Sequence, residues 1–93
     1  QSAFMRQSEH LASMIQEEMY DKLRALNLKN RGVKQAPFWV MVGASMPSVL
    51  CEIGFVTNSY EARILKTSRY QQKIAEGIFN GLRRFKKDYE NAI

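Results

Sequence analysis

Apolar side chains recur every three or four residues near the start of the chain. They are Leu11, Met14, Ile15, Met19, Leu23 and Leu26. This is the spacing of one face of an α-helix, so it predicts an amphipathic helix over Ser8 to Leu26. The methionines share the stripe with the leucines, which favours a role in the core over an adaptable binding groove.

The middle of the chain has a different pattern. Phe38–Val42 is short, aromatic and branched, and Val49–Val56 is a continuous apolar run interrupted only by Glu52. Both segments are typical of strands, and the continuous run is typical of a strand covered on both faces in a parallel sheet. Because two strands are too few for a buried sheet, we expect further strands elsewhere in the polypeptide.

Two more helices are predicted after residue 57. Asn58 and Glu61 form a capping-box-like pair that starts a helix over Ser59 to Lys66. A last helix starts near Ser68, and its apolar positions again follow helical spacing: Ile74, Ile78, Leu82, Phe85 and Tyr89. The predicted order is helix, strand, strand, helix, helix, which is an α/β fold.

Two glycines interrupt the last predicted helix, at Gly77 and Gly81. Each costs about 1 kcal/mol relative to alanine in a helix interior. This cost suggests close packing against a neighbouring element, with neutral drift as the alternative.

Composition and charge limit the possible functions. The 93 residues are 45% hydrophobic and 25% charged, which fits one small globular domain or part of a larger one and excludes a disordered tail. The net charge is +5, and the densest basic cluster is Arg83, Arg84, Lys86 and Lys87 around Phe85. This cluster suggests either attraction to a polyanion or, more commonly, the solvated face of a helix.

Glu52 is the candidate for chemistry. A carboxylate inside a buried apolar strand costs several kcal/mol unless it is paired, protonated or metal-bound. It suits a general acid or base, and the alternative is a structural acid that pairs with an arginine or caps a backbone amide. Strand neighbours point to opposite faces, so Cys51 is expected to be a buried small hydrophobe. His10 lies near the start of the first predicted helix, where a surface histidine is commoner than a metal ligand or a proton shuttle.

Three segments together carry a family resemblance: Asn30–Phe38, Met46–Asn58 and Tyr70–Ala75. They resemble the C-terminal part of the zinc-dependent N-acetylmuramoyl-L-alanine amidases, the amidase type 3 family. Ser8–Gln16 is similar to the helix that precedes them, so the resemblance extends over residues 8 to 85. Two positions depart from the family pattern, Cys51 in place of an aliphatic residue and Met41–Gly43 in place of a leucine–arginine pairing.

The resemblance implies a mixed β-sheet flanked by helices, with residues 1–93 as the C-terminal portion of one catalytic domain. It implies hydrolysis of the amide between N-acetylmuramic acid and L-alanine, with Glu52 at the position of an essential glutamate. The zinc ion is expected on two histidines and a glutamate of the N-terminal half of the domain. Since the chain has one histidine, it holds no such site itself and is expected to be inactive alone.

The partners expected from the same resemblance are peptidoglycan and the N-terminal half of the domain, at a periplasmic or extracellular location. Neither a nucleic-acid partner nor a membrane span is expected, since no apolar run reaches the length of a span. The alternative function is a non-catalytic module that binds cell-wall polymer through its basic surface.

Overall fold

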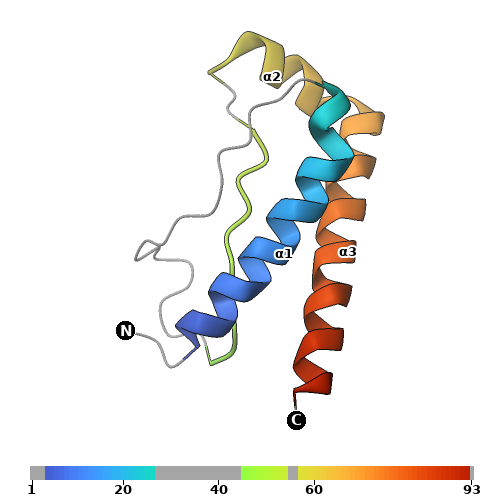
Figure 1. The fold of residues 1–93 in the computed structure, drawn as a ribbon. Coiled ribbons are helices and arrows are strands. Elements are labelled where there is room, and N and C mark those ends of the chain that lie inside the picture. Colours follow the sequence, from blue (N-terminus) through green and yellow to red (C-terminus); the bar gives the residue numbers. More distant parts are fainter. Residues whose placement is uncertain (1–3, 27–44, 55–56, 93) are drawn as a thin grey trace.

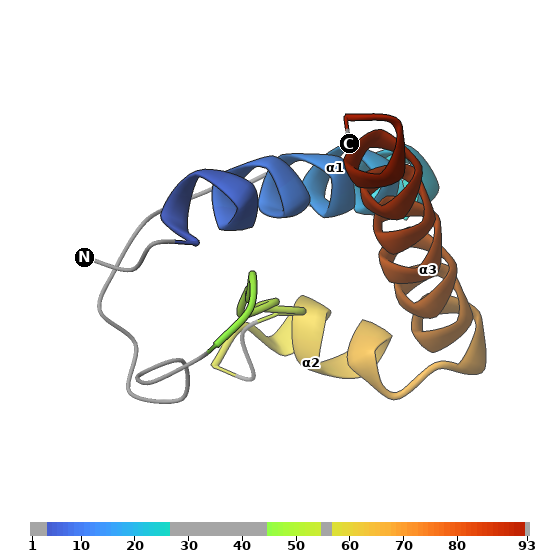
Figure 2. The same ribbon diagram turned by 90° about the horizontal axis from the view of Figure 1, so that it is seen from below.

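The computed structural model describes residues 4–26, 45–54 and 57–92. Their helices are α1 (Met5–Leu23), continued by the 3-10 turn η1 (Arg24–Leu26), then α2 (Ser59–Leu65) and α3 (Ser68–Asn91). Helices α1 and α3 lie side by side, and α2 lies across one end of the pair (Figure 1). Seen from below, the three helices form an arc, and residues 45–54 lie on its inner side (Figure 2).

Helix α1 confirms the amphipathic pattern at the start of the chain. It begins three residues before the predicted Ser8, and η1 completes the predicted range to Leu26. Its buried side chains are Leu11, Ile15, Met19 and Leu23, all from the predicted stripe. Tyr70 and Ile74 of α3 complete the core, with Ile78 and Phe85 packed against it.

The two glycines of α3 lie where α1 approaches most closely. A Cβ on Gly77 would lie 2.7 Å from Cα of Met19, and one on Gly81 would lie 2.6 Å from Cα of Ile15. Real Cβ atoms essentially never come within 3.0 Å of such atoms. The predicted close packing is therefore confirmed, and the neighbour is the backbone of α1 itself.

The predicted helix starts at Asn58 and near Ser68 are also confirmed. Asn58 Oδ1 accepts a hydrogen bond from the backbone N–H of Glu61 at 3.0 Å. Thr67 Oγ1 caps α3 by accepting from the N–H of Tyr70 at 3.2 Å. These side chains satisfy backbone donors that the first turn of a helix leaves unpaired.

The predicted mixed β-sheet is wrong: residues 4–26, 45–54 and 57–92 contain helices and no strand. Val49–Gly54 is an extended segment held by helices instead of by a neighbouring strand. The backbone N–H of Ser48 donates to Ser8 Oγ of α1 at 3.0 Å, and the hydroxyl of Tyr70 in α3 donates to the carbonyl of Ile53. The other predicted strand, Phe38–Val42, and the last two residues of the second lie outside the described residues.

One face of the extended segment packs on the helices and the other does not. Val49 and Cys51 contact the core, whereas Leu50 and Glu52, on the opposite face, are exposed, Leu50 by 46%. The apolar run therefore does not mark a strand covered on both faces. Across the described ranges, no helix is both long enough and apolar enough to cross a membrane.

We expect Gly81→Ala to destabilise the chain by up to about 2 kcal/mol. Overpacking against the α1 backbone costs about 1–3 kcal/mol, which exceeds the gain of about 1 kcal/mol in helix propensity. Urea unfolding followed by circular dichroism at 222 nm measures the difference. Lys87→Ala, on the exposed side of α3, is the matched control and should change stability by less than about 0.5 kcal/mol. A stabilised Gly81→Ala variant would show that the two backbones do not touch.

Candidate functional site

Glu52 lies on the extended segment, and its side chain is exposed. The prediction that this carboxylate is buried is wrong, because the outer face of the segment is uncovered. The prediction that Cys51 and Glu52 face opposite sides is confirmed, since Cys51 packs against the core. Because Glu52 is exposed, its carboxylate carries no cost of burial. Its assignment as a general acid or base therefore depends on the resemblance to the amidase family.

The backbone on both sides of Glu52 is fixed by the helices. Cys51 packs against the core, and the carbonyl of Ile53 accepts the hydrogen bond from Tyr70. Gly54 has a φ of +148°, which side-chain-bearing residues rarely adopt, and a Cβ there would lie 3.3 Å from the Leu65 side chain of α2. An accessible carboxylate on a fixed backbone can accept or donate a proton to a molecule docked on this face.

Cys51 has the surroundings of a structural cysteine. Its side chain is half-buried against the helix core, and burial raises the pKa of its thiol. Because the thiolate is the nucleophilic form, a raised pKa lowers the reactivity of the residue near neutral pH. The structure thus supports the prediction of a small hydrophobe.

His10 joins the beginning of α1 to the end of α3. Its Nε2 lies 3.0 Å from Oδ2 of Asp88, and its ring centroid lies 5.8 Å from that of Phe85. Both partners of this pair are about half exposed. The contacts are those of a surface residue that links two helices, as the sequence predicted.

One residue of the basic cluster at the end of α3, Arg84, forms ion pairs with α1. Arg84 Nη1 donates to Glu17 Oε1 at 3.1 Å and to Glu18 Oε2 at 2.9 Å, and these hydrogen bonds raise the pKa of Arg84. Arg83 lies over the ring of Phe79, and Lys86 pairs with Glu90 one turn away. The solvated-face interpretation therefore explains most of this cluster.

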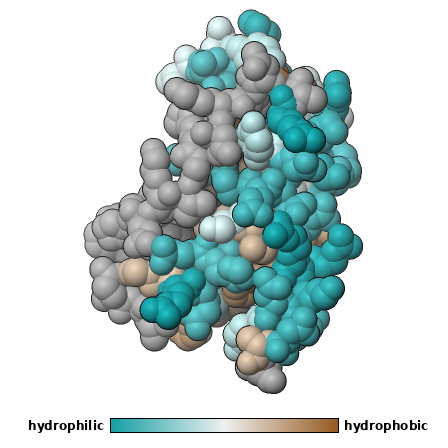
Figure 3. Space-filling view, in the orientation of Figure 1, coloured by the Kyte–Doolittle hydropathy of each residue, from teal (hydrophilic) through white to brown (hydrophobic). Residues whose placement is uncertain are grey.

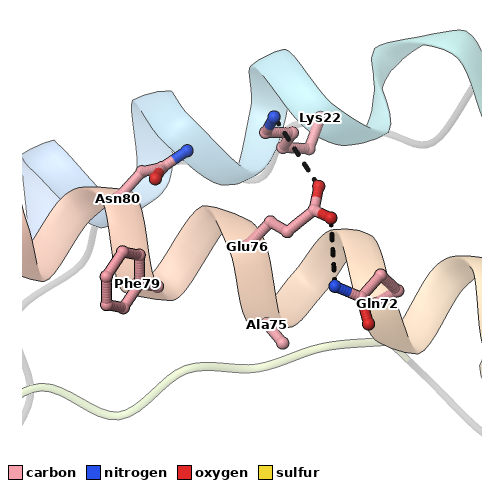
Figure 4. Close-up of a pocket in the computed structure, with 6 residues that line it drawn as sticks. All are labelled: Lys22, Gln72, Ala75, Glu76, Phe79 and Asn80. Carbon is pink, nitrogen blue, oxygen red and sulfur yellow. Dashed lines mark hydrogen bonds and ion pairs between the residues drawn. The ribbon is translucent and has the colours of Figure 1, made fainter.

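Sequence reasoning missed an open groove of about 560 Å³ that is lined by residues of both α1 and α3. It is lined by Lys22, Gln72, Ala75, Glu76, Phe79 and Asn80. The Glu76 carboxylate is turned toward Lys22 Nζ at 3.6 Å and Gln72 Nε2 at 3.0 Å (Figure 4). The Gln72 hydrogen bond, followed by the charges of Lys22 and Lys73, holds the pKa of Glu76 below its ordinary value. The sequence held one sign of this groove: Gln72 and Glu76 are four residues apart, so they are neighbours on one face of a helix.

A zinc ion does not fit the residues that the structure describes. No three histidine, cysteine or acidic side chains in these ranges lie together as a metal site would need. The whole chain has one histidine, so it cannot supply a pair of imidazole ligands.

Comparison with known proteins decides the family. The sequence profile of the N-acetylmuramoyl-L-alanine amidases matches residues 1–84. The chain belongs to this family. No solved structure matches the chain.

Curated relatives support the family assignment. An uncharacterized protein of Bacillus subtilis, YqiI, is 45% identical over 75 residues, which are 81% of this chain and 35% of that protein. The N-acetylmuramoyl-L-alanine amidase LytC of the same species is 44% identical over 66 residues, or 70% of this chain and 13% of LytC. The amidase AmiA of Salmonella typhimurium is 47% identical over 55 residues, or 59% and 19%. The chain thus spans about a third or less of these relatives.

We expect the stability advantage of the Glu76 carboxylate to be lost in acid. Because its pKa is lower in the folded chain, wild type should exceed Glu76→Gln in stability above the ordinary carboxyl range. The difference should vanish as the pH falls through the depressed pKa. Urea midpoints across a pH series measure it, and Gln72→Ala should remove part of the same dependence. A wild-type advantage that does not vary with pH contradicts this assignment.

We expect the Cys51 thiol to be alkylated several-fold more slowly in the folded chain than in urea at the same neutral pH. Partial burial limits access, and the raised pKa lowers the thiolate fraction. The iodoacetamide reaction followed by mass spectrometry measures both rates, with Cys51→Ser as the blank. Equal rates in the two conditions would show that the thiol is not protected.

Proposed function

We propose that this chain is part of the catalytic domain of a peptidoglycan hydrolase. Its substrate is the amide bond that joins N-acetylmuramic acid to L-alanine of the stem peptide, in the periplasm or the extracellular cell wall. The observation that carries the proposal is the match of the amidase family profile to residues 1–84. Relatives named N-acetylmuramoyl-L-alanine amidase, LytC and AmiA among them, support it.

Glu52 is the general base and acid in this proposal. Its carboxylate takes a proton from the water whose oxygen attacks the amide carbonyl carbon. It then delivers a proton to the nitrogen of L-alanine as the carbon–nitrogen bond breaks, so that the amine leaves neutral. The exposure of the side chain and the fixed backbone of Cys51, Ile53 and Gly54 support this role, because a substrate can reach the carboxylate without rearrangement.

The proposal needs a second contribution that the described residues do not make. We expect a zinc ion on ligands in the N-terminal half of the domain, beside which residues 1–93 form the C-terminal portion. With one histidine in the chain and no cluster of metal-ligating side chains in the described ranges, residues 1–93 alone should release no stem peptide.

We expect Glu52→Gln, introduced into the complete catalytic domain, to lower the rate of stem-peptide release by at least about 100-fold, since an amide side chain cannot carry the proton. The assay measures new α-amino groups of L-alanine from purified peptidoglycan. Glu9→Gln is the matched control, because it makes the same chemical change at an exposed position of α1. It should leave the rate within about twofold.

Equal rates for wild type and Glu52→Gln would remove Glu52 from the reaction. No release by the wild-type domain, with or without added zinc, would remove the hydrolase proposal altogether. A non-catalytic cell-wall module would then be the remaining interpretation.

A further inference from the structure

The acidic side chains of the described residues are mostly paired. In residues 4–26, 45–54 and 57–92, six of them lie within 4 Å of a basic side chain: Glu17, Glu18, Asp21, Glu76, Asp88 and Glu90. Their partners are His10 and Lys22 of α1, Arg24 of η1, and Arg84 and Lys86 of α3. The positive charge that this pairing leaves over is therefore not spread evenly over the molecule.

Part of the surplus gathers where α2 meets α3. Arg63, Lys66 and Arg69 are exposed there, and none of the three forms an ion pair with another described residue. We call these three residues the basic corner. Lys73 follows one turn later, and the sequence from Ala62 to Ala75 contains no acid. Side chains of intermediate and hydrophilic character lie at this end of the molecule, and hydrophilic ones continue down α3 (Figure 3).

The backbone of the basic corner is held rigidly. Thr67 Oγ1 donates to the carbonyl of Ile64 at 2.7 Å while it caps α3. The side-chain amide of Gln71 donates to the carbonyl of Leu65 at 2.9 Å. The turn between the two helices thus holds the backbone positions from which the three cations project, so binding need not order this backbone.

Helix electrostatics explains only part of the basic corner. Arg63 and Lys66 lie at the C-terminal end of α2, where a helix dipole favours cations. Arg69 lies in the first turn of α3, where the dipole disfavours a cation, and that turn contains no acid. The helix dipole therefore does not account for Arg69.

We propose that the basic corner binds a linear cell-wall polymer of repeating phosphodiesters. Three exposed cations close together in the sequence attract a polyanion, and the contacts need no deep pocket. A single-stranded nucleic acid would also need aromatic platforms for its bases. One exposed ring, that of Tyr60, lies beside the basic corner, and its hydroxyl is bound to the carbonyl of Leu26. The exposed rings of Phe79 and Tyr89 lie about 15 Å and about 30 Å beyond Arg69 along the axis of α3, so successive bases would not find a row of platforms at the corner.

This inference depends on the proposed function only for the location of the protein at the cell wall. The binding of polymer is measured without any hydrolysis. If Glu52→Gln did not change the rate of hydrolysis, the proposal of polymer binding at the basic corner would still stand. If the basic corner did not bind polymer, the proposed role of Glu52 would still stand.

The test measures binding of fluorescent poly(glycerol phosphate) to the chain by anisotropy at rising salt concentration. We expect Arg63→Gln/Lys66→Gln/Arg69→Gln to weaken binding at least about tenfold and to flatten its salt dependence. Arg6→Gln/Arg83→Gln/Lys87→Gln is the matched control. It removes two arginines and one lysine that are also exposed, and so lowers the net charge by the same amount. Its affinity should stay within about threefold of wild type.

Three results would overturn the proposal. The first is no binding of the polymer at low salt. The second is equal weakening by the two triple variants, which would mean that net charge alone attracts the polymer. The third is tighter, corner-dependent binding of a random oligonucleotide of equal charge, which would identify a nucleic acid as the partner. Circular dichroism at 222 nm confirms that each variant is folded before it is measured.

Discussion

The close approach of α1 and α3 at Gly77 and Gly81 is the constraint on which the described part of the molecule depends. A Cβ on Gly81 would lie only 2.6 Å from Cα of Ile15, so the contact has no room for a side chain at this position. The apolar stripe of α1 is buried at this contact, and burial of apolar area is the main stabilising term. The ion pairs along the contact, such as those of Arg84 with α1, are exposed and contribute little individually.

The same contact positions the segment that carries Glu52. Ser8 of α1 holds one end of this segment, Tyr70 of α3 holds the carbonyl of Ile53, and Leu65 of α2 packs beside Gly54. A wider separation of α1 and α3 would move the first two anchors apart. The position of Glu52 thus depends on the packing of Gly77 and Gly81, which are distant from it in the sequence. In this way a rigid pair of helices positions a side chain on a loop.

The sequence predicted the elements that local rules determine. Helical periodicity located α1 and α3, the side chains of Asn58 and Thr67 mark true helix starts, and the cost of Gly77 and Gly81 indicated a close neighbour. The sheet and the buried Glu52 were wrong for one shared reason. A continuous apolar run shows that a segment contacts something, but not whether strands or helices cover it, or on how many faces. Pairs such as Arg84 with Glu17, 67 residues apart, leave no local pattern to detect.

The two proposed activities use separate elements, and this separation has a physical consequence. Glu52 lies in a stretch from Gln35 to Ala62 that contains no lysine or arginine, whereas the basic corner begins at the next residue, Arg63. Long-range attraction between the corner and a polyanion acts on encounter and falls with salt. Proton transfer at a carboxylate acts in the chemical step and requires contact. Because Leu65 of α2 packs beside Gly54, two residues from Glu52, α2 fixes the segment that carries the carboxylate relative to the basic corner that begins on the same helix.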